Sequence, residues 1–179
     1  MSMTLPEQAT VGLEQLLAAK ERRAARQNRW LNSYQGALVS LTLVTPGEVK
    51  DSPRYRLSMQ EAIASCHQLL QQRHWPVLAH EVFWLATGPE AFWAVAHGAA
   101  ELKAATVALE QAHALGRLWD IDVLSQQEGI IGRRSLDQAA RHCLLCEQPA
   151  HACARSRQHP LPQIIEKIED LIDGYFIPR

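Results

Sequence analysis

Two aspartates lie two residues apart in the segment GRLWDIDV at positions 116–123. Side chains alternate along a β-strand, so Asp120 and Asp122 would share one face with Leu118 and Leu124. The other face would be apolar and could anchor the strand in a core: Trp119, Ile121 and Val123. Two carboxylates about 6–7 Å apart at their Cα atoms can share a magnesium ion that carries a phosphorylated substrate. The same pair is also typical of the solvated side of a half-exposed strand.

Residues around this segment supply the other groups that phosphoryl or nucleotidyl transfer requires. Such chemistry needs cations for the phosphate oxygens and the leaving group, and sometimes a base for the attacking hydroxyl. The candidates are Lys103, Arg117, Arg133 and Arg134 for phosphate, and His113 or Glu110 as the base. Glu110 and His113 are equally consistent with an i, i+3 surface pair. Arg133 and Arg134 cannot both face one side of a regular strand.

A second group of candidate ligands follows the pattern Cys-x2-Cys-x6-Cys-x5-His: Cys143, Cys146, Cys153 and His159. Three thiolates and an imidazole suit a tetrahedral zinc ion that staples a loop with little core of its own. Such a site would be structural, because four protein ligands leave no position for substrate. The second half of the pattern lacks the close pair usual in zinc motifs. Reduced, partly buried cysteines are therefore the alternative.

The composition is that of an ordinary globular protein. The 179 residues are 47% hydrophobic and 21% charged, and we expect one domain over residues 1–179. The formal net charge of −1 disfavours nonspecific binding to nucleic acid or to an anionic membrane. No secretory signal or membrane-spanning run is evident, which predicts a cytoplasmic protein. Phosphate-binding loops and nucleophile elbows of known pattern are also missing from the sequence.

Periodicity predicts the elements that must position these residues. Helices are expected at 13–30, 59–73, 99–114 and 161–175, strands at 37–45, 117–124 and 130–134, and a hairpin from 76–86 and 91–96. A Cys/His-rich loop is expected at 142–159. The helix at 99–114 carries a polar stripe beside its apolar one: Lys103, Thr106, Glu110 and His113. The arginines at 22, 23, 26 and 29 suggest a solvated helix face or an anion site.

These elements predict an α+β fold. We expect a single compact domain with a mixed or antiparallel sheet, flanking helices and an Asp-x-Asp strand like that of nucleotidyltransferases.

The combined motifs resemble the holo-citrate-lyase synthases, also called apo-citrate-lyase phosphoribosyl-dephospho-CoA transferases. The resemblance covers about residues 13–173 and rests on GRLWDIDV at 116–123 and LExxH at 109–113. It also rests on RHCLLCEQ at 141–148, CAR at 153–155 and His159. Shorter matches are RxxRQ at 23–27, TPG at 45–47, KDS at 50–52 and GPE at 88–90.

The resemblance implies that a serine hydroxyl of the apo acyl-carrier subunit of citrate lyase attacks the α-phosphate of triphosphoribosyl-dephospho-CoA, and that pyrophosphate leaves. The family motif matches at Asp120, Asp122, His113 and Arg117, and we infer catalytic roles for these four residues, with Mg²⁺ on the aspartates and Lys50 among the substrate-binding residues. Two alternatives are a related carrier-protein modifier of the malonate decarboxylase type, and a zinc-stapled interaction module without catalysis.

Overall fold

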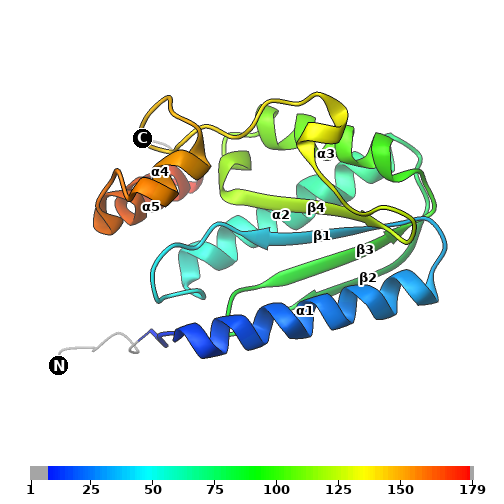
Figure 1. The fold of residues 1–179 in the computed structure, drawn as a ribbon, viewed down its shortest axis with the longest axis horizontal. Helices are drawn as coiled ribbons and strands as arrows, with labels where there is room; N and C mark the ends of the chain where they lie inside the picture. The colour runs from blue at the N-terminus through cyan, green and yellow to red at the C-terminus, as the bar shows by residue number, and fades with distance from the viewer. Residues whose placement is uncertain (1–7, 178–179) are drawn as a thin grey trace.

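One antiparallel sheet with the strand order β2-β3-β1-β4-β5 forms the centre of the fold (Figure 1). The strands are β1 (Ala37–Leu43), β2 (Val77–Phe83), β3 (Glu90–Val95), β4 (Trp119–Ser125) and β5 (Gly129–Ile131). The computed structural model describes residues 8–177, so positions 1–7 and 178–179 of the predicted domain lie outside it. The predicted α+β class is confirmed, and the sheet is antiparallel at every strand pair.

Helices cover both faces of this sheet. Helix α1 (Leu13–Ser33) lies along one face, as Figure 1 shows. The other face is covered by α2 (Pro53–Gln72), α3 (Ala99–Ala112) and α5 (Leu161–Phe176), and the short α4 (Ala150–Ser156) precedes α5. Within residues 8–177, no helix is long and apolar enough to cross a membrane.

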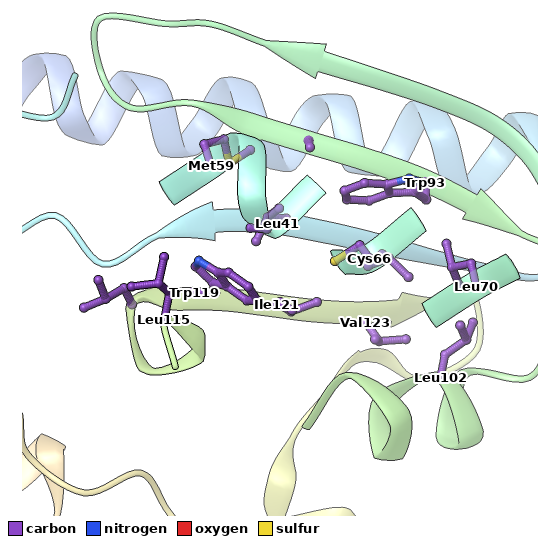
Figure 2. Close-up of a cluster of buried hydrophobic side chains, with 14 of the residues drawn as sticks. Leu41, Met59, Cys66, Leu70, Trp93, Leu102, Leu115, Trp119, Ile121 and Val123 are labelled. Atoms are coloured by element: carbon purple, nitrogen blue, oxygen red, sulfur yellow. The ribbon is translucent and has the colours of Figure 1, made fainter. Parts of the chain in front are cut away.

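The main core lies between the sheet and α2, α3 and α5 (Figure 2). Alternate residues of the inner strands point into it, including Leu41, Trp93 and Ile121, which are fully buried. Trp119 stands in the same layer and donates its indole N–H to the hydroxyl oxygen of Ser58 at 3.2 Å. The main core thus holds β4 in place through Trp119, Ile121 and Val123 on one of its faces. The intervening residues of β4, Asp120 and Asp122, therefore point to the face that carries α1.

The face under α1 changes from apolar to polar along the strands. At one end Leu38, Phe92 and Leu124 pack with Trp30 and Leu31 of α1. Toward the other end the contacts are polar: Gln27 donates to Ser40 at 3.0 Å, and Glu90 pairs with Arg23 at 3.2 Å and Arg26 at 2.6 Å. The basic part of α1 thus lies on the sheet.

The structure corrects the predicted boundaries around the aspartates. The strand predicted at 117–124 begins at Trp119, because the preceding residues form the 3-10 turn η1 (Gly116–Leu118). A Cβ at Gly116 would lie 2.0 Å from the carbonyl oxygen of Glu110, so only glycine allows this turn directly against α3. Leu118 consequently packs in the main core and does not share the face of the aspartates.

Other boundaries differ for local reasons. The strand predicted at 130–134 ends at Ile131 and is followed by a second 3-10 turn, η2 (Arg133–Leu136). The helix predicted at 59–73 begins at Pro53, because Ser52 caps it by accepting the Tyr55 N–H at 3.1 Å. The loop predicted at 142–159 contains α4, which is too short to show an apolar period.

Candidate active site

Asp120 and Asp122 share one face of β4, where they lie opposite Thr42 and Ser40 of β1. Asp120 is exposed and Asp122 is half-buried. Among residues 8–177, neither carboxylate takes part in an ion pair. Burial raises the pKa of Asp122, and the neighbouring Asp120 raises it further. Lys103 and Arg23 are near enough to lower the pKa of Asp122 but form no ion pair with it, so the oxygen atoms of both carboxylates remain available to a ligand.

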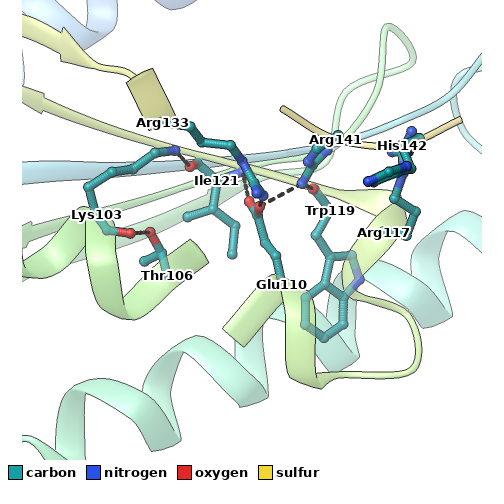
Figure 3. Close-up of polar contacts among 9 residues, drawn as sticks. All are labelled: Lys103, Thr106, Glu110, Arg117, Trp119, Ile121, Arg133, Arg141 and His142. Atoms are coloured by element: carbon teal, nitrogen blue, oxygen red, sulfur yellow. Dashed lines mark hydrogen bonds and ion pairs between the residues drawn. The ribbon is translucent and has the colours of Figure 1, made fainter. Parts of the chain in front are cut away.

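At Ile121, the residue between these aspartates, the edge of β4 is hydrogen-bonded by side chains of α3 and not by a neighbouring strand (Figure 3). Strand β5 pairs only with residues 123–125, so the peptide groups of Ile121 have no strand partner on that side. The carboxylate of Glu110 accepts the Ile121 N–H at 3.0 Å, and the Lys103 ammonium donates to the Ile121 carbonyl oxygen at 2.7 Å. Lys103, Thr106 and Glu110 of the predicted polar stripe are therefore buried and not exposed to solvent. His113, the fourth predicted member, lies beyond the end of α3.

Glu110 also gathers two arginines (Figure 3). Its second carboxylate oxygen accepts a hydrogen bond from Arg133 and forms an ion pair of 2.8 Å with Arg141. Arg141 donates as well to the carbonyl oxygen of Trp119. With both oxygens occupied, Glu110 is placed to hold β4 and the two guanidinium groups. Burial lowers the pKa of Lys103, a change that Glu110 and Asp122 oppose.

Two clefts meet at Asp120. The first, which we call the α1 cleft, has a volume of about 250 Å³ and is lined by Asp120, Thr42 and the cations Lys20, Arg23 and Lys50. The second, the α3 cleft, has a volume of about 380 Å³ and is lined by both aspartates and by Lys103, Glu110, Arg133, Arg141 and His151. Asp120 lines both clefts. A ligand with several phosphates could reach from one group of cations to the other across this carboxylate.

Lys50 is held at the α1 cleft by its own loop. Its ammonium group donates to the carbonyl oxygen of Thr45. Burial lowers the pKa of Lys50, and Lys20 lowers it further, so the two ammonium groups repel each other. An anion between them would relieve this repulsion.

The structure does not bring His113 to the aspartates. His113 accepts the Leu115 N–H at its Nδ1 atom, while its Nε2 atom lies 3.2 Å from a carboxylate oxygen of Glu61. Its ring packs against Trp119, with ring centroids 4.3 Å apart, on the core side of β4. Arg134 is exposed on η2 and lines neither cleft. The sheet thus separates His113 from the predicted metal ligands.

Arg117 lies beside the α3 cleft in a larger pocket. Its Nε–H donates to the carbonyl oxygen of His142 at 2.8 Å, and burial together with nearby Arg141 lowers its pKa. The pocket, of about 650 Å³, is mainly apolar and also includes Leu144, Ala154 and Ile164. Figure 3 shows Arg133, Arg141 and Arg117 following one another along β4.

The four predicted zinc ligands converge. One ligand atom each from Cys143, Cys146, Cys153 and His159 lies within 4.8 Å of the others. The Sγ atoms of Cys146 and Cys153 are 3.4 Å apart, and Nε2 of His159 is 3.3 Å from Sγ of Cys146. Four such donors this close could hold one metal ion.

Sequence reasoning did not assign Lys20 or Arg141 to the site, and it left Arg23 undecided. Lys20 and Arg23 are one helical turn apart on α1, a spacing that could have indicated a shared face. The motif at 141–148 pointed to Arg141 only as part of the cysteine cluster. Their approach to Asp120 depends on packing between distant segments, which local spacing does not reveal.

Comparison with known proteins shows the family to which the chain belongs. Residues 11–175 match the family described as apo-citrate lyase phosphoribosyl-dephospho-CoA transferase. A protein of that name from Citrobacter koseri is 42% identical over 171 residues, which cover 94% of this chain and 93% of the relative. Relatives of the same name from Escherichia coli and Shigella flexneri are 39% identical over 172 residues, covering 94% of each chain. The chain therefore belongs to the apo-citrate lyase phosphoribosyl-dephospho-CoA transferase family of enzymes.

Proposed function

We propose that this enzyme transfers a phosphoribosyl-dephospho-CoA group from triphosphoribosyl-dephospho-CoA to a serine of the apo acyl-carrier subunit of citrate lyase. The serine hydroxyl releases its proton to solvent as its oxygen forms a bond to the α-phosphorus, the bond from that phosphorus to the oxygen that bridges to the β-phosphate breaks, and pyrophosphate leaves. The observation that carries the proposal is the position of Asp120 at the junction of two cation-lined clefts. A triphosphate needs such an arrangement, with cations on both sides of the reacting phosphorus.

Asp120 and Asp122 would hold Mg²⁺, because they offer oxygen ligands without an ion-pair partner on one face of β4. When bound, the metal would neutralise charge on the triphosphate. Lys20, Arg23 and Lys50 would hold the departing pyrophosphate in the α1 cleft. The sugar and nucleotide part would then lie in the α3 cleft, where Arg133 and Arg141 can contact its phosphates.

The Cys₃His cluster fits a structural Zn²⁺ ion. Zinc–sulfur bonds of about 2.3 Å in a tetrahedron place sulfur atoms about 3.8 Å apart, close to the 3.4 Å between Cys146 and Cys153. The Leu145 N–H points to Sγ of Cys143 at 3.4 Å, a contact that would stabilise a thiolate ligand. The ion would tie the loop at 142–149 to α4 and to the start of α5. Cysteines that remain outside disulfides, as zinc ligands or as thiols, are typical of cytoplasmic proteins and support that proposed location.

Transfer is tested by incubating the purified enzyme with Mg²⁺, the triphosphoribosyl donor and the apo carrier subunit of citrate lyase. We expect one pyrophosphate released for each carrier that gains the mass of the prosthetic group. A carrier whose acceptor serine is replaced by alanine should release none. Pyrophosphate release without a gain in carrier mass would show hydrolysis of the donor and contradict the proposal.

The malonate decarboxylase carrier tests the closest alternative. Both carriers could use the same nucleotide donor, so only the protein acceptor distinguishes the two readings. Faster modification of the malonate decarboxylase carrier than of the citrate lyase carrier would assign the enzyme to that system.

A further inference from the structure

The pocket of about 650 Å³ beside the active site has no role in the transfer step described above. It lies between α4, the first turn of α5 and the segment after β1, and Leu144, Ala154, Leu161 and Ile164 give it an apolar wall. Leu161 is 45% exposed, so this part of the wall is open to solvent. An apolar cavity of this size is typical of small-molecule sites.

The pocket adjoins the α3 cleft. Ala150 lines both, and Arg117 in the pocket follows Arg141 of the cleft along β4 (Figure 3). Only the Nε atom of Arg117 is hydrogen-bonded to another residue within the described part of the chain, so its two terminal nitrogens can contact a ligand. Arg117 of the pocket and Arg141 of the α3 cleft therefore place cationic groups between the apolar wall and the aspartates that line the cleft.

We propose that this pocket binds the pantetheine arm of the donor, with the diphosphate of dephospho-CoA lying on Arg117 and Arg141. The inference rests on the proposed function. Dephospho-CoA joins an uncharged, flexible arm to an adenosine diphosphate, and the reacting phosphate belongs to the separate phosphoribosyl group. A path from Asp120 through the α3 cleft to the apolar pocket has the same order: metal ligands, cations, then apolar wall.

The Cys₃His cluster forms part of that wall. Cys143, Cys153 and His159 all line the pocket. A metal ion in the cluster would hold α4 and the start of α5 in position, so it would also preserve the shape of the pocket. Release of the metal should then weaken binding of the arm, while the cations of the α1 cleft remain unaffected.

Binding of dephospho-CoA and of ADP, which lacks the arm, tests the inference by calorimetry. The wild-type enzyme should bind dephospho-CoA about tenfold more tightly or better, because only dephospho-CoA can bury the arm. Ala154→Trp would fill the pocket from α4 and should reduce dephospho-CoA affinity to that of ADP, with ADP affinity unchanged. Ala152→Trp is the matched control, since Ala152 is exposed on the same helix and does not line the pocket.

Equal affinities of the wild-type enzyme for the two ligands would overturn the inference, even if Ala154→Trp did not fold. An equal loss for both ligands in folded Ala154→Trp would also overturn it and would place the adenosine in the pocket. Leu161→Glu, at the exposed wall, provides a second variant and should likewise weaken only dephospho-CoA. These outcomes are separate from failure of the proposed function, which would appear as no transfer by the wild-type enzyme.

Discussion

The carboxylate of Glu110 accepts a hydrogen bond of 3.0 Å from the backbone N–H of Ile121, the residue between Asp120 and Asp122. One carboxylate on α3 thereby fixes the position of both candidate metal ligands on β4. The same carboxylate binds Arg133 and Arg141, so the cations and the aspartates of the α3 cleft are held by a single buried group. The geometry of the site therefore depends on a residue that need not contact substrate.

Glu110→Gln should lower both stability and activity. The amide can still accept the Ile121 N–H, but it leaves two arginines without a counter-charge, a loss of about 3 kcal/mol for a buried ion pair. We expect transfer to fall about 10- to 100-fold, because small displacements of catalytic groups are costly. Chemical denaturation and kinetics measure the two effects. Glu101→Gln, an exposed position on the same helix, is the control. Wild-type stability in Glu110→Gln would show that the network does not support β4.

Asp122→Asn should raise thermal stability at neutral pH while transfer falls about 100-fold or more. Burial and Asp120 raise the pKa of Asp122, so the ionised carboxylate destabilises the folded state. As the pH falls, Asp122 takes up a proton and this penalty disappears, so the melting temperatures of wild type and variant should converge. Scanning calorimetry from pH 7 to pH 4 without magnesium measures this. A variant that is less stable than wild type at pH 7 would contradict the account.

Chelation should expose three of the four cysteines. In the native protein zinc would protect Cys143, Cys146 and Cys153 from alkylation, and Cys66 is protected separately because it is buried. Burial also raises the pKa of the Cys66 thiol to about 12. We expect no fast-reacting thiol in the native protein, three after metal removal and four in denaturant, by mass spectrometry. Metal analysis should give one zinc per chain. Three rapidly alkylated thiols in freshly purified, unchelated protein would remove zinc from the account.

Acid should lower the stability of the fold through His67 of α2, which packs on the sheet. The His67 ring accepts the Trp93 indole N–H at 3.3 Å and packs against His80, with ring centroids 4.5 Å apart. Burial, and to a lesser extent His80, lowers the pKa of His67 in the folded protein. The unfolded chain, with an ordinary histidine pKa of about 6.5, therefore takes up a proton more readily than the folded protein. Folding stability is consequently full above that pH and is lost as the pH falls from it through the lowered value. His67→Gln keeps an acceptor for Trp93 but cannot gain the charge. Its melting temperature should therefore fall less than that of wild type between pH 7 and pH 5. Equal decreases would exclude His67 as the source.

The sequence predicted most of the fold because the apolar periods are strong. The hairpin of β2 and β3, the helices α1, α3 and α5, and the alternation that places Asp120 and Asp122 together all follow from local patterns. The errors in the predicted boundaries arise where a single contact overrides the apolar periodicity. Gly116 allows a 3-10 turn against Glu110, which moves Arg117 off the strand.

The site was less predictable because it combines distant segments. Glu110 lies on α3 and faces β4, whereas His113 follows the last helical residue with an extended backbone and faces Glu61. Spacing i, i+3 predicts a shared face only while the helix continues, and the sequence did not show that it ends before His113. The approach of Lys20 and Lys50 to Asp120 depends on how α1 packs across the sheet. The convergence of the three cysteines and His159 was predictable from the sequence, because cysteine and histidine at such spacing indicate a metal site even within a loop.

Intact-mass measurement of the carrier subunit with Asp120→Asn tests the central claim most directly. Asp120 is exposed and forms no ion pair within residues 8–177, so the substitution should leave the fold unchanged. Asp170→Asn, an exposed carboxylate on α5, is the matched control. With donor and Mg²⁺ present, we predict that wild type and Asp170→Asn add the prosthetic mass to the carrier, while Asp120→Asn leaves the carrier unmodified. A carrier modified at the wild-type rate by Asp120→Asn would contradict the assignment of this carboxylate to the reaction.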